Sequence, residues 1–146
     1  ISGQLADAGV DPQRVTLLDG AAMQAMSAAD VVLQASGTAV LEAALLRKPS
    51  VATYRVAPFS YWLARHVFRI RPPHVTMPNF LTKEPLVPEF IQGDAKPGPL
   101  ADAVLALLDD PQRRQFISER FDRLRQALAL DADQRAANAV LELARS

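Results

Sequence analysis

The sequence of 146 residues contains no cysteine. This absence excludes a disulfide scaffold, a cysteine nucleophile and metal sites built on thiolates. No apolar run approaches the roughly 20 residues that a membrane-spanning helix needs. The first residue is Ile1 rather than methionine, so we expect the chain to be part of a longer protein. Since 49% of the residues are hydrophobic and the length suits one domain, the composition predicts a folded globular unit.

Acidic side chains are missing from residues 47–83, in the middle of the chain, although the formal net charge of the whole chain is zero. The seven bases of this acid-free stretch are Arg47, Lys48, Arg55, Arg65, Arg69, Arg71 and Lys83. Acids dominate the segments on either side. A locally positive segment favours an anionic partner through its electric field. The alternative is a solvated basic face whose charges pair with acids elsewhere in the fold.

Short apolar runs alternate with helical segments over the first half of the chain. The predicted strands are residues 15–19, 31–35, 50–56 and 74–77. The predicted helices are residues 21–29, 39–48, 59–70, 100–108, 111–130 and 134–144, and residues 84–99 are predicted to form a loop. Apolar positions on one face of the longest helix are Ile117, Phe121, Leu124 and Leu128.

Strands separated by short helices predict βαβ crossovers and a parallel sheet that is covered on both faces. We therefore expect an α/β fold, a Rossmann-like doubly wound parallel sheet followed by C-terminal helices. Residues 1–110 would form the sheet domain. Residues 111–146 would form helices that pack on another domain or on a second protomer.

The most informative turn is Ser36-Gly37-Thr38, which joins a predicted buried strand to a predicted helix. Ligands of open α/β sheets bind beyond the carboxyl ends of the strands. A helix start offers unpaired N–H groups and a partial positive charge. Gly37 would let a ligand approach the backbone, while Ser36 and Thr38 add hydroxyl donors. The turn therefore predicts a phosphate or pyrophosphate site.

Glu42 lies one turn into the same predicted helix. Its carboxylate would accept hydrogen bonds from the two ribose hydroxyls of a nucleotide whose phosphates sit at the turn. The alternative is purely structural: Ser36 or Thr38 caps the helix, and Glu42 complements the helix dipole.

Five blocks of the sequence, in the same order, resemble the lipid-A-disaccharide synthase family. They are residues 35–46, residues 49–65 with the pair Tyr54-Arg55, residues 75–81, residues 86–92 and residues 133–144. The resemblance implies an inverting, metal-independent glycosyltransferase of the GT-B arrangement, with two Rossmann-like domains. Such enzymes join UDP-2,3-diacylglucosamine to 2,3-diacylglucosamine 1-phosphate (lipid X) and release UDP. The UDP-sugar is a substrate, so the resemblance implies no cofactor.

The resemblance also implies a site for the UDP-sugar donor. Its residues are Ser36, Gly37, Thr38, Glu42, Arg55, Asn79, Glu89 and Gln92. The Ser-Gly-Thr turn matches the holder of the UDP phosphates, and Glu42 matches the ribose-binding carboxylate. Asn79 matches a polar position that faces the donor, and the fixed charge of Arg55 would offset phosphate charge.

The resemblance is incomplete in two places. The family usually carries a Gly-Arg pair where this chain has Thr82-Lys83-Glu84, so the geometry of that loop is open. The family's glycine-serine-arginine phosphate loop and its acid/base carboxylate belong before Ile1. We therefore assign no catalytic base here. His66 and His74 are better explained as packed or surface residues.

Several partners follow from the resemblance. We expect UDP-diacylglucosamine, lipid X and the cytoplasmic face of the bacterial inner membrane, with peripheral attachment, and no nucleic acid. Residues 58–71 alternate aromatic and arginine side chains, which suits either an interfacial helix or, preferably, a helix packed on the core. The C-terminal helices would allow a homodimer. The alternative functions are another GT-B sugar-nucleotide transferase, a UDP-sugar epimerase domain, or a non-catalytic nucleotide-binding module.

Overall fold

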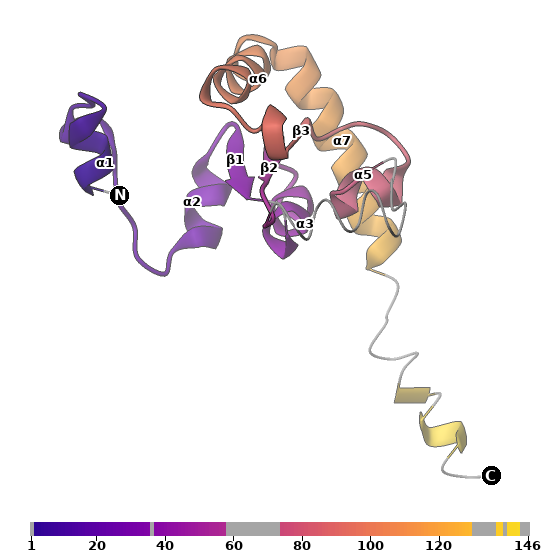
Figure 1. Ribbon diagram of the computed structural model, residues 1–146. Coiled ribbons are helices and arrows are strands. Elements are labelled where there is room, and N and C mark those ends of the chain that lie inside the picture. Colours follow the sequence, from indigo (N-terminus) through magenta and orange to yellow (C-terminus); the bar gives the residue numbers. More distant parts are fainter. Residues whose placement is uncertain (1, 36, 58–73, 130–136, 139, 144–146) are drawn as a thin grey trace.

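A three-stranded parallel sheet forms the centre of the protein in the computed structural model (Figure 1). The structure describes residues 2–35, 37–57, 74–129, 137–138 and 140–143. The strands are β1 (Val32–Ala35), β2 (Ser50–Tyr54) and β3 (Glu89–Ile91), in the order β1-β2-β3. Both pairings are parallel, with Val32 opposite Ser50 and Ala52 opposite Glu89. The predicted strands 31–35 and 50–56 are therefore confirmed.

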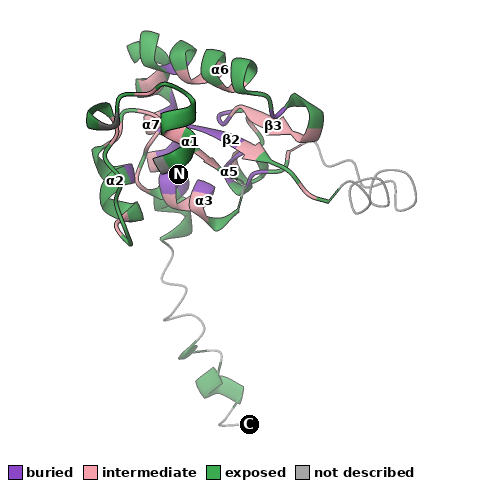
Figure 2. Ribbon diagram, turned by 60° about the vertical axis from the view of Figure 1, so that its left-hand side comes forward, coloured by how far each residue is buried: buried purple, intermediate pink, exposed green. Residues whose placement is uncertain are grey.

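Helices cover both faces of this sheet. They are α3 (Thr38–Leu45), α5 (Met77–Thr82), α6 (Pro97–Asp109) and α7 (Pro111–Leu128). Helix α3 contacts both α5 and α7, whereas α6 contacts β2. Figures 1 and 2 show α6 on one side of the sheet and α3 on the other. The predicted α/β fold with a doubly wound parallel sheet is confirmed.

The hydrophobic core lies between the sheet and the helices, and Figure 2 shows its buried residues in purple. Its members are Val40, Ala44, Val51, Ala52, Leu86, Val87, Leu107, Ile117 and Phe121. Two of the four apolar positions predicted for one face of α7, Ile117 and Phe121, are fully buried. Leu124 is also buried, whereas Leu128 is exposed near the end of the helix. Because α7 shares the core of the sheet, a domain boundary at residue 110 stays a prediction.

The N-terminal part of the chain is less closely packed. It contains α1 (Ser2–Asp7), the short 3-10 helix η1 (Pro12–Arg14) and α2 (Ala22–Ala28). Figure 1 shows α1 standing away from the sheet, and α2 contacts α3. Helix α2 confirms the prediction for residues 21–29. Residues 137–138 and 140–143 are helical and exposed, as part of the predicted C-terminal helix 134–144.

Two predicted strands are wrong. Residues 15–19 form no strand, and Leu17 and Leu18 are 54% and 57% exposed. An apolar run becomes a strand only where a neighbouring strand satisfies its backbone, and the described sheet offers it none. Residues 74–77 lead instead into α5, which carries Pro78 within its first turn. The fixed φ of proline suits a helix start, so Pro78 begins a helix here rather than stopping a strand.

The predicted loop at residues 84–99 is also wrong in part. It contains β3, the 3-10 helix η3 (Gln92–Asp94) and the first turn of α6, which starts at Pro97. Strand β3 pairs only with β2 and follows Pro88, which suits an edge strand. The prolines that indicated a loop in the sequence therefore mark the start of an edge strand and of a helix.

Other predictions fall outside the described residues. These are the helix 59–70 with His66, and the end of the long helix at residues 131–133. No helix among the described residues is both long and apolar enough to cross a membrane.

Candidate functional site

The parallel sheet brings the ends of three sequence blocks to one edge. Gly37 lies two residues after the end of β1, whereas Arg55 directly follows β2 and Gln92 directly follows β3. Because all three strands run in the same direction, their carboxyl ends meet at the same edge, where ligands of open α/β sheets bind. Three of the predicted site residues therefore lie together at this edge.

Gly37 and Thr38 form the start of α3, and both are exposed. The backbone of Gly37 has φ 150° and ψ −158°, a region that only glycine occupies without strain. A Cβ built there would meet no atom within 4 Å, so conformation rather than space requires glycine. No described side chain caps α3. Within the described residues no side chain occupies its first N–H groups, and such groups suit an anion. Ser36 lies outside the described residues.

Glu42 is half-buried on α3, one turn after Thr38. Its carboxylate has no hydrogen-bond or ion-pair partner in the part of the chain that the structure describes. An unpaired carboxylate one turn from a helix start is available to accept hydrogen bonds from a ligand. The ribose role stays a prediction.

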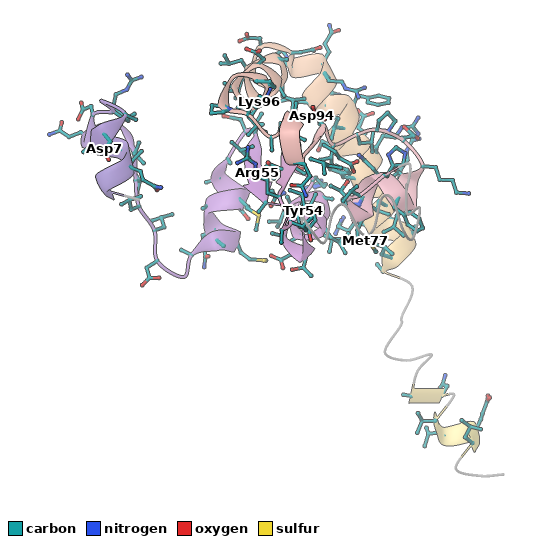
Figure 3. The ribbon with its side chains drawn as sticks, viewed as in Figure 1. Asp7, Tyr54, Arg55, Met77, Asp94 and Lys96 are labelled. Carbon is teal, nitrogen blue, oxygen red and sulfur yellow. The ribbon has the colours of Figure 1, made fainter. Side chains whose placement is uncertain are left out.

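Arg55 and Gln92 tie together the loops that follow β2 and β3. The Arg55 guanidinium donates from Nη2 to the Ala95 carbonyl at 2.9 Å and from Nε to the Gln92 carbonyl at 3.4 Å. In return, Gln92 Nε2 donates to the Val56 carbonyl at 3.1 Å. Figure 3 shows Arg55 close to the turn that carries Asp94 and Lys96.

Asn79 and Glu89 belong to a network inside the fold. Asn79 is 1% exposed, and it exchanges two hydrogen bonds of 2.8 Å with the N–H and carbonyl of Val87. Its Nδ2 also donates to Glu89 Oε1 at 3.0 Å. That carboxylate further accepts from Thr76 N at 2.8 Å, from Thr76 Oγ1 at 2.6 Å and from Val75 N. The carboxylate of Glu89, a residue of β3, thus lies against the start of α5. Whether either side chain meets a donor stays a prediction.

The family model described as Lipid-A-disaccharide synthetase matches residues 6–143. The chain belongs to this family. Lipid-A-disaccharide synthase of Alkalilimnicola ehrlichii is 47% identical over 130 residues, which are 89% of this chain and 34% of that protein. The synthases of Pseudomonas savastanoi pv. phaseolicola and Enterobacter sp. are 45% and 43% identical over 88% and 89% of this chain. The chain spans about a third of the length of these relatives.

The loop in which this chain departs from the lipid-A-disaccharide synthase pattern keeps a glycine-like backbone. Lys83 ends α5 with φ 56°, in the left-handed conformation that glycine adopts most readily. Thr82 Oγ1 donates to the Pro78 carbonyl at 2.8 Å. Glu84 Oε2 forms an ion pair with Arg120 Nε at 3.4 Å. Lys83 thus has a backbone conformation that usually favours glycine, although the residue is a lysine.

Thr76 belongs to the same network as Asn79 and Glu89, and the sequence analysis did not single it out. It is 2% exposed and supplies two donors to the Glu89 carboxylate. The signal was its place directly before Met77 and Pro78, which is a helix N-cap position followed by proline. The second histidine, His74, is half-buried just before this residue. The described residues hold no group of three side chains placed to bind a metal ion.

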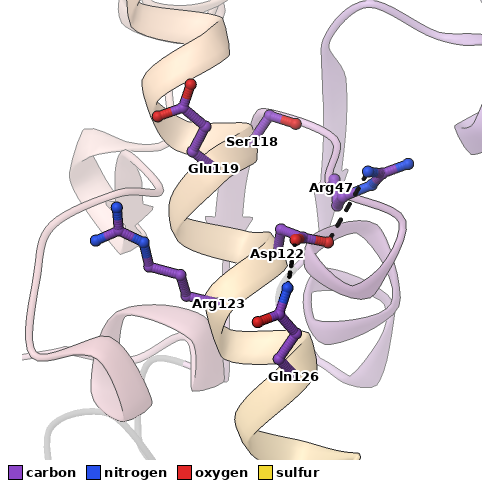
Figure 4. Close-up of a pocket in the computed structure, with 6 residues that line it drawn as sticks. All are labelled: Arg47, Ser118, Glu119, Asp122, Arg123 and Gln126. Atoms are coloured by element: carbon purple, nitrogen blue, oxygen red, sulfur yellow. Dashed lines mark hydrogen bonds and ion pairs between the residues drawn. The ribbon is translucent and has the colours of Figure 1, made fainter.

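A shallow cleft lies away from this edge, between the end of α3 and α7 (Figure 4). Its lining residues are Arg47, Ser118, Glu119, Asp122, Arg123 and Gln126. Arg47 lies 3.9 Å from Asp122, which also accepts a 2.7 Å hydrogen bond from Gln126. Two arginines face two acids, so the cleft has no net preference for an anion. It lies at the opposite end of α3 from Gly37.

Proposed function

We propose that this chain binds the UDP part of a sugar-nucleotide donor within a lipid-A-disaccharide synthase. The observation that carries the proposal is the start of α3 at Gly37, which no described side chain caps and which lies at the carboxyl edge of the parallel sheet. Membership of the family supports the choice of a UDP-sugar over other anions.

The charges at this edge fit a diphosphate that needs no metal. Helix N–H groups and the partial positive charge of α3 would face the phosphates, and Arg55 adds a full charge nearby. Such fixed donors stabilise the negative charge that develops on departing UDP. In the proposed reaction the acceptor hydroxyl displaces UDP with inversion, helped by a general base that this chain does not supply.

We further propose the substrates and location of the whole protein. The donor would be UDP-2,3-diacylglucosamine, the acceptor lipid X, and the products lipid A disaccharide 1-phosphate and UDP. Because these substrates carry acyl chains, the protein would work as a peripheral protein at the cytoplasmic face of the inner membrane. A homodimer through the C-terminal helices stays a prediction.

Calorimetry with UDP tests the donor site, and the protein used is a full-length synthase that contains this chain. Glu42→Gln keeps the size of the side chain and removes its charge, so we expect UDP affinity to fall about tenfold through weaker bonds to the ribose. The matched control is Glu119→Gln, an exposed acid on α7, which should bind UDP like the unchanged chain.

The 2′-deoxy form of UDP makes the test specific. Glu42→Gln should cost less affinity for this ligand than for UDP, because one of the two ribose hydroxyls is gone. Equal affinity of the Glu42→Gln variant and the unchanged chain for UDP would contradict the ribose role. No measurable binding of UDP by a full-length synthase that contains the unchanged chain would contradict the donor site itself.

A further inference from the structure

The loops after β2 and β3 are joined by reciprocal hydrogen bonds. Each loop supplies one side chain and receives bonds on its backbone carbonyls: Arg55 reaches Gln92 and Ala95, while Gln92 reaches Val56. We name these three bonds the loop brace. Its two side chains stand one residue beyond the strands, at the edge that would hold the donor.

The backbone conformation of Gln92 indicates that other residues must stabilise the loop after β3. Its φ of 52° is in the left-handed region, which a residue with a Cβ enters at a cost in conformational energy. Such a backbone persists only where its surroundings hold it. Arg55 provides that hold, because its guanidinium binds the carbonyl of Gln92 itself and, three residues later, the carbonyl of the buried Ala95.

Arg55 is also a charge that the fold does not neutralise. No acidic side chain pairs with it among the described residues, so its positive charge stays directed at the edge of the sheet. Its geometry nevertheless commits two guanidinium N–H groups to carbonyls. A planar fork that binds two acceptors at once is what distinguishes arginine from lysine.

We propose that Arg55 and Gln92 are positioning residues that preform the donor site by fixing these two loops. Loops that are already ordered need not be ordered on binding, which increases affinity. This inference rests on the proposed function. It differs from the simpler role of Arg55 as a point charge on a phosphate, for which a lysine would serve.

The test compares Arg55→Lys, Arg55→Met and Gln92→Met in UDP calorimetry. Arg55→Lys keeps the charge but not the fork, so we expect it to lose about tenfold in affinity, and Arg55→Met, which loses the charge as well, should lose more. Gln92→Met should lose affinity as well. The double variant Arg55→Lys/Gln92→Met should lose less than the two single losses combined, because both act through one brace.

Amide hydrogen exchange measures the effect of the loop brace on local stability without any ligand. The amide of Ala95 donates to the Gln92 carbonyl, and the amide of Lys96 donates to the Asp94 carbonyl. Both amides should exchange faster in Arg55→Lys while the midpoint of urea unfolding stays unchanged, since the loops are local. The matched control, Lys96→Met, removes an exposed positive charge from the same loop and should leave exchange and affinity unchanged.

Two results would overturn the proposal. One is full UDP affinity in Arg55→Lys together with a loss in Arg55→Met, which would make Arg55 a charge only. The other is unchanged exchange at Ala95 and Lys96 in Arg55→Lys. Failure of the proposed function looks different: a full-length synthase that contains the unchanged chain would bind no UDP, while the exchange experiment would still show the brace.

Discussion

Asn79 shows how one buried amide holds three segments together. Its carbonyl oxygen and its NH2 group both bind Val87, in the segment between α5 and β3, and the NH2 group also binds Glu89 on β3. The side chain is on α5 and has 1% of its surface exposed. Buried polar groups that lose their partner cost more than the bond itself is worth, so this residue fixes local geometry strongly.

Asn79→Ala should therefore destabilise the fold. The change leaves the Val87 N–H and carbonyl without a partner in a buried place, for which we expect a loss of about 2–4 kcal/mol in the free energy of unfolding. Urea unfolding followed by circular dichroism measures it. Phe80→Ala, at a neighbouring position that is 59% exposed, is the control and should change little. An unchanged midpoint for Asn79→Ala would contradict the buried role.

At the corner between α6 and α7, side chains satisfy the unpaired backbone groups at both helix ends. The Asp110 carboxylate accepts from the Arg113 N–H at 2.8 Å and so caps the start of α7, where Pro111 follows. Arg114 Nη1 donates to the carbonyls of Leu107 and Leu108 at the end of α6. Those carbonyls have no partner within their own helix, so the arginine satisfies them and complements the helix dipole.

Arg114→Met should loosen this corner. The methionine keeps apolar length but cannot donate to the Leu107 carbonyl, so we expect a loss of about 1–2 kcal/mol in the free energy of unfolding. Arg123→Met, an exposed arginine on the same helix, is the control. Chemical denaturation compares the two variants. Equal stability of both variants would show that the end of α6 is satisfied by water.

At the scale of the whole molecule, α7 and the sheet share a single core. Phe121 and Ile117 are fully buried in one cluster with residues of α3 and β2, and Leu107 of α6 belongs to the same cluster. One contiguous core predicts one cooperative unfolding transition. The sheet residues before position 110 would lose much of their cover without α7.

Phe121→Ala tests whether the sheet and α7 unfold as one cooperative unit. Removing a fully buried phenyl ring from the shared core should cost about 3–5 kcal/mol. The loss should appear in the sheet as well as in α7, so hydrogen exchange of the β2 amides should accelerate together with that of α7. Phe116→Ala, at a position that is 38% exposed on the same helix, is the control. Protected β2 amides in Phe121→Ala would instead support separate units divided at residue 110.

Local signals predicted most of the long elements but not the edge of the sheet. Apolar spacing and prolines placed α6 and α7 within a few residues, and β-branched runs placed β1 and β2. The same rules failed for β3, because the three residues of this strand, between Pro88 and Gln92, carry too little pattern. They also placed a strand at residues 15–19, since an apolar run alone does not show whether a partner strand exists.

The sequence by itself determined the succession of β1, α3 and β2, and with it the edge where Gly37 and Arg55 meet, because parallel strands impose that topology. The place of Gln92 at this edge depends on β3, which only the tertiary structure showed. Only the tertiary structure decided what the polar side chains do there. Asn79 and Glu89 satisfy each other and buried backbone groups, and Arg55 reaches carbonyls some 40 residues away along the chain. Such bonds depend on distances between segments remote in sequence, and no local pattern encodes those distances.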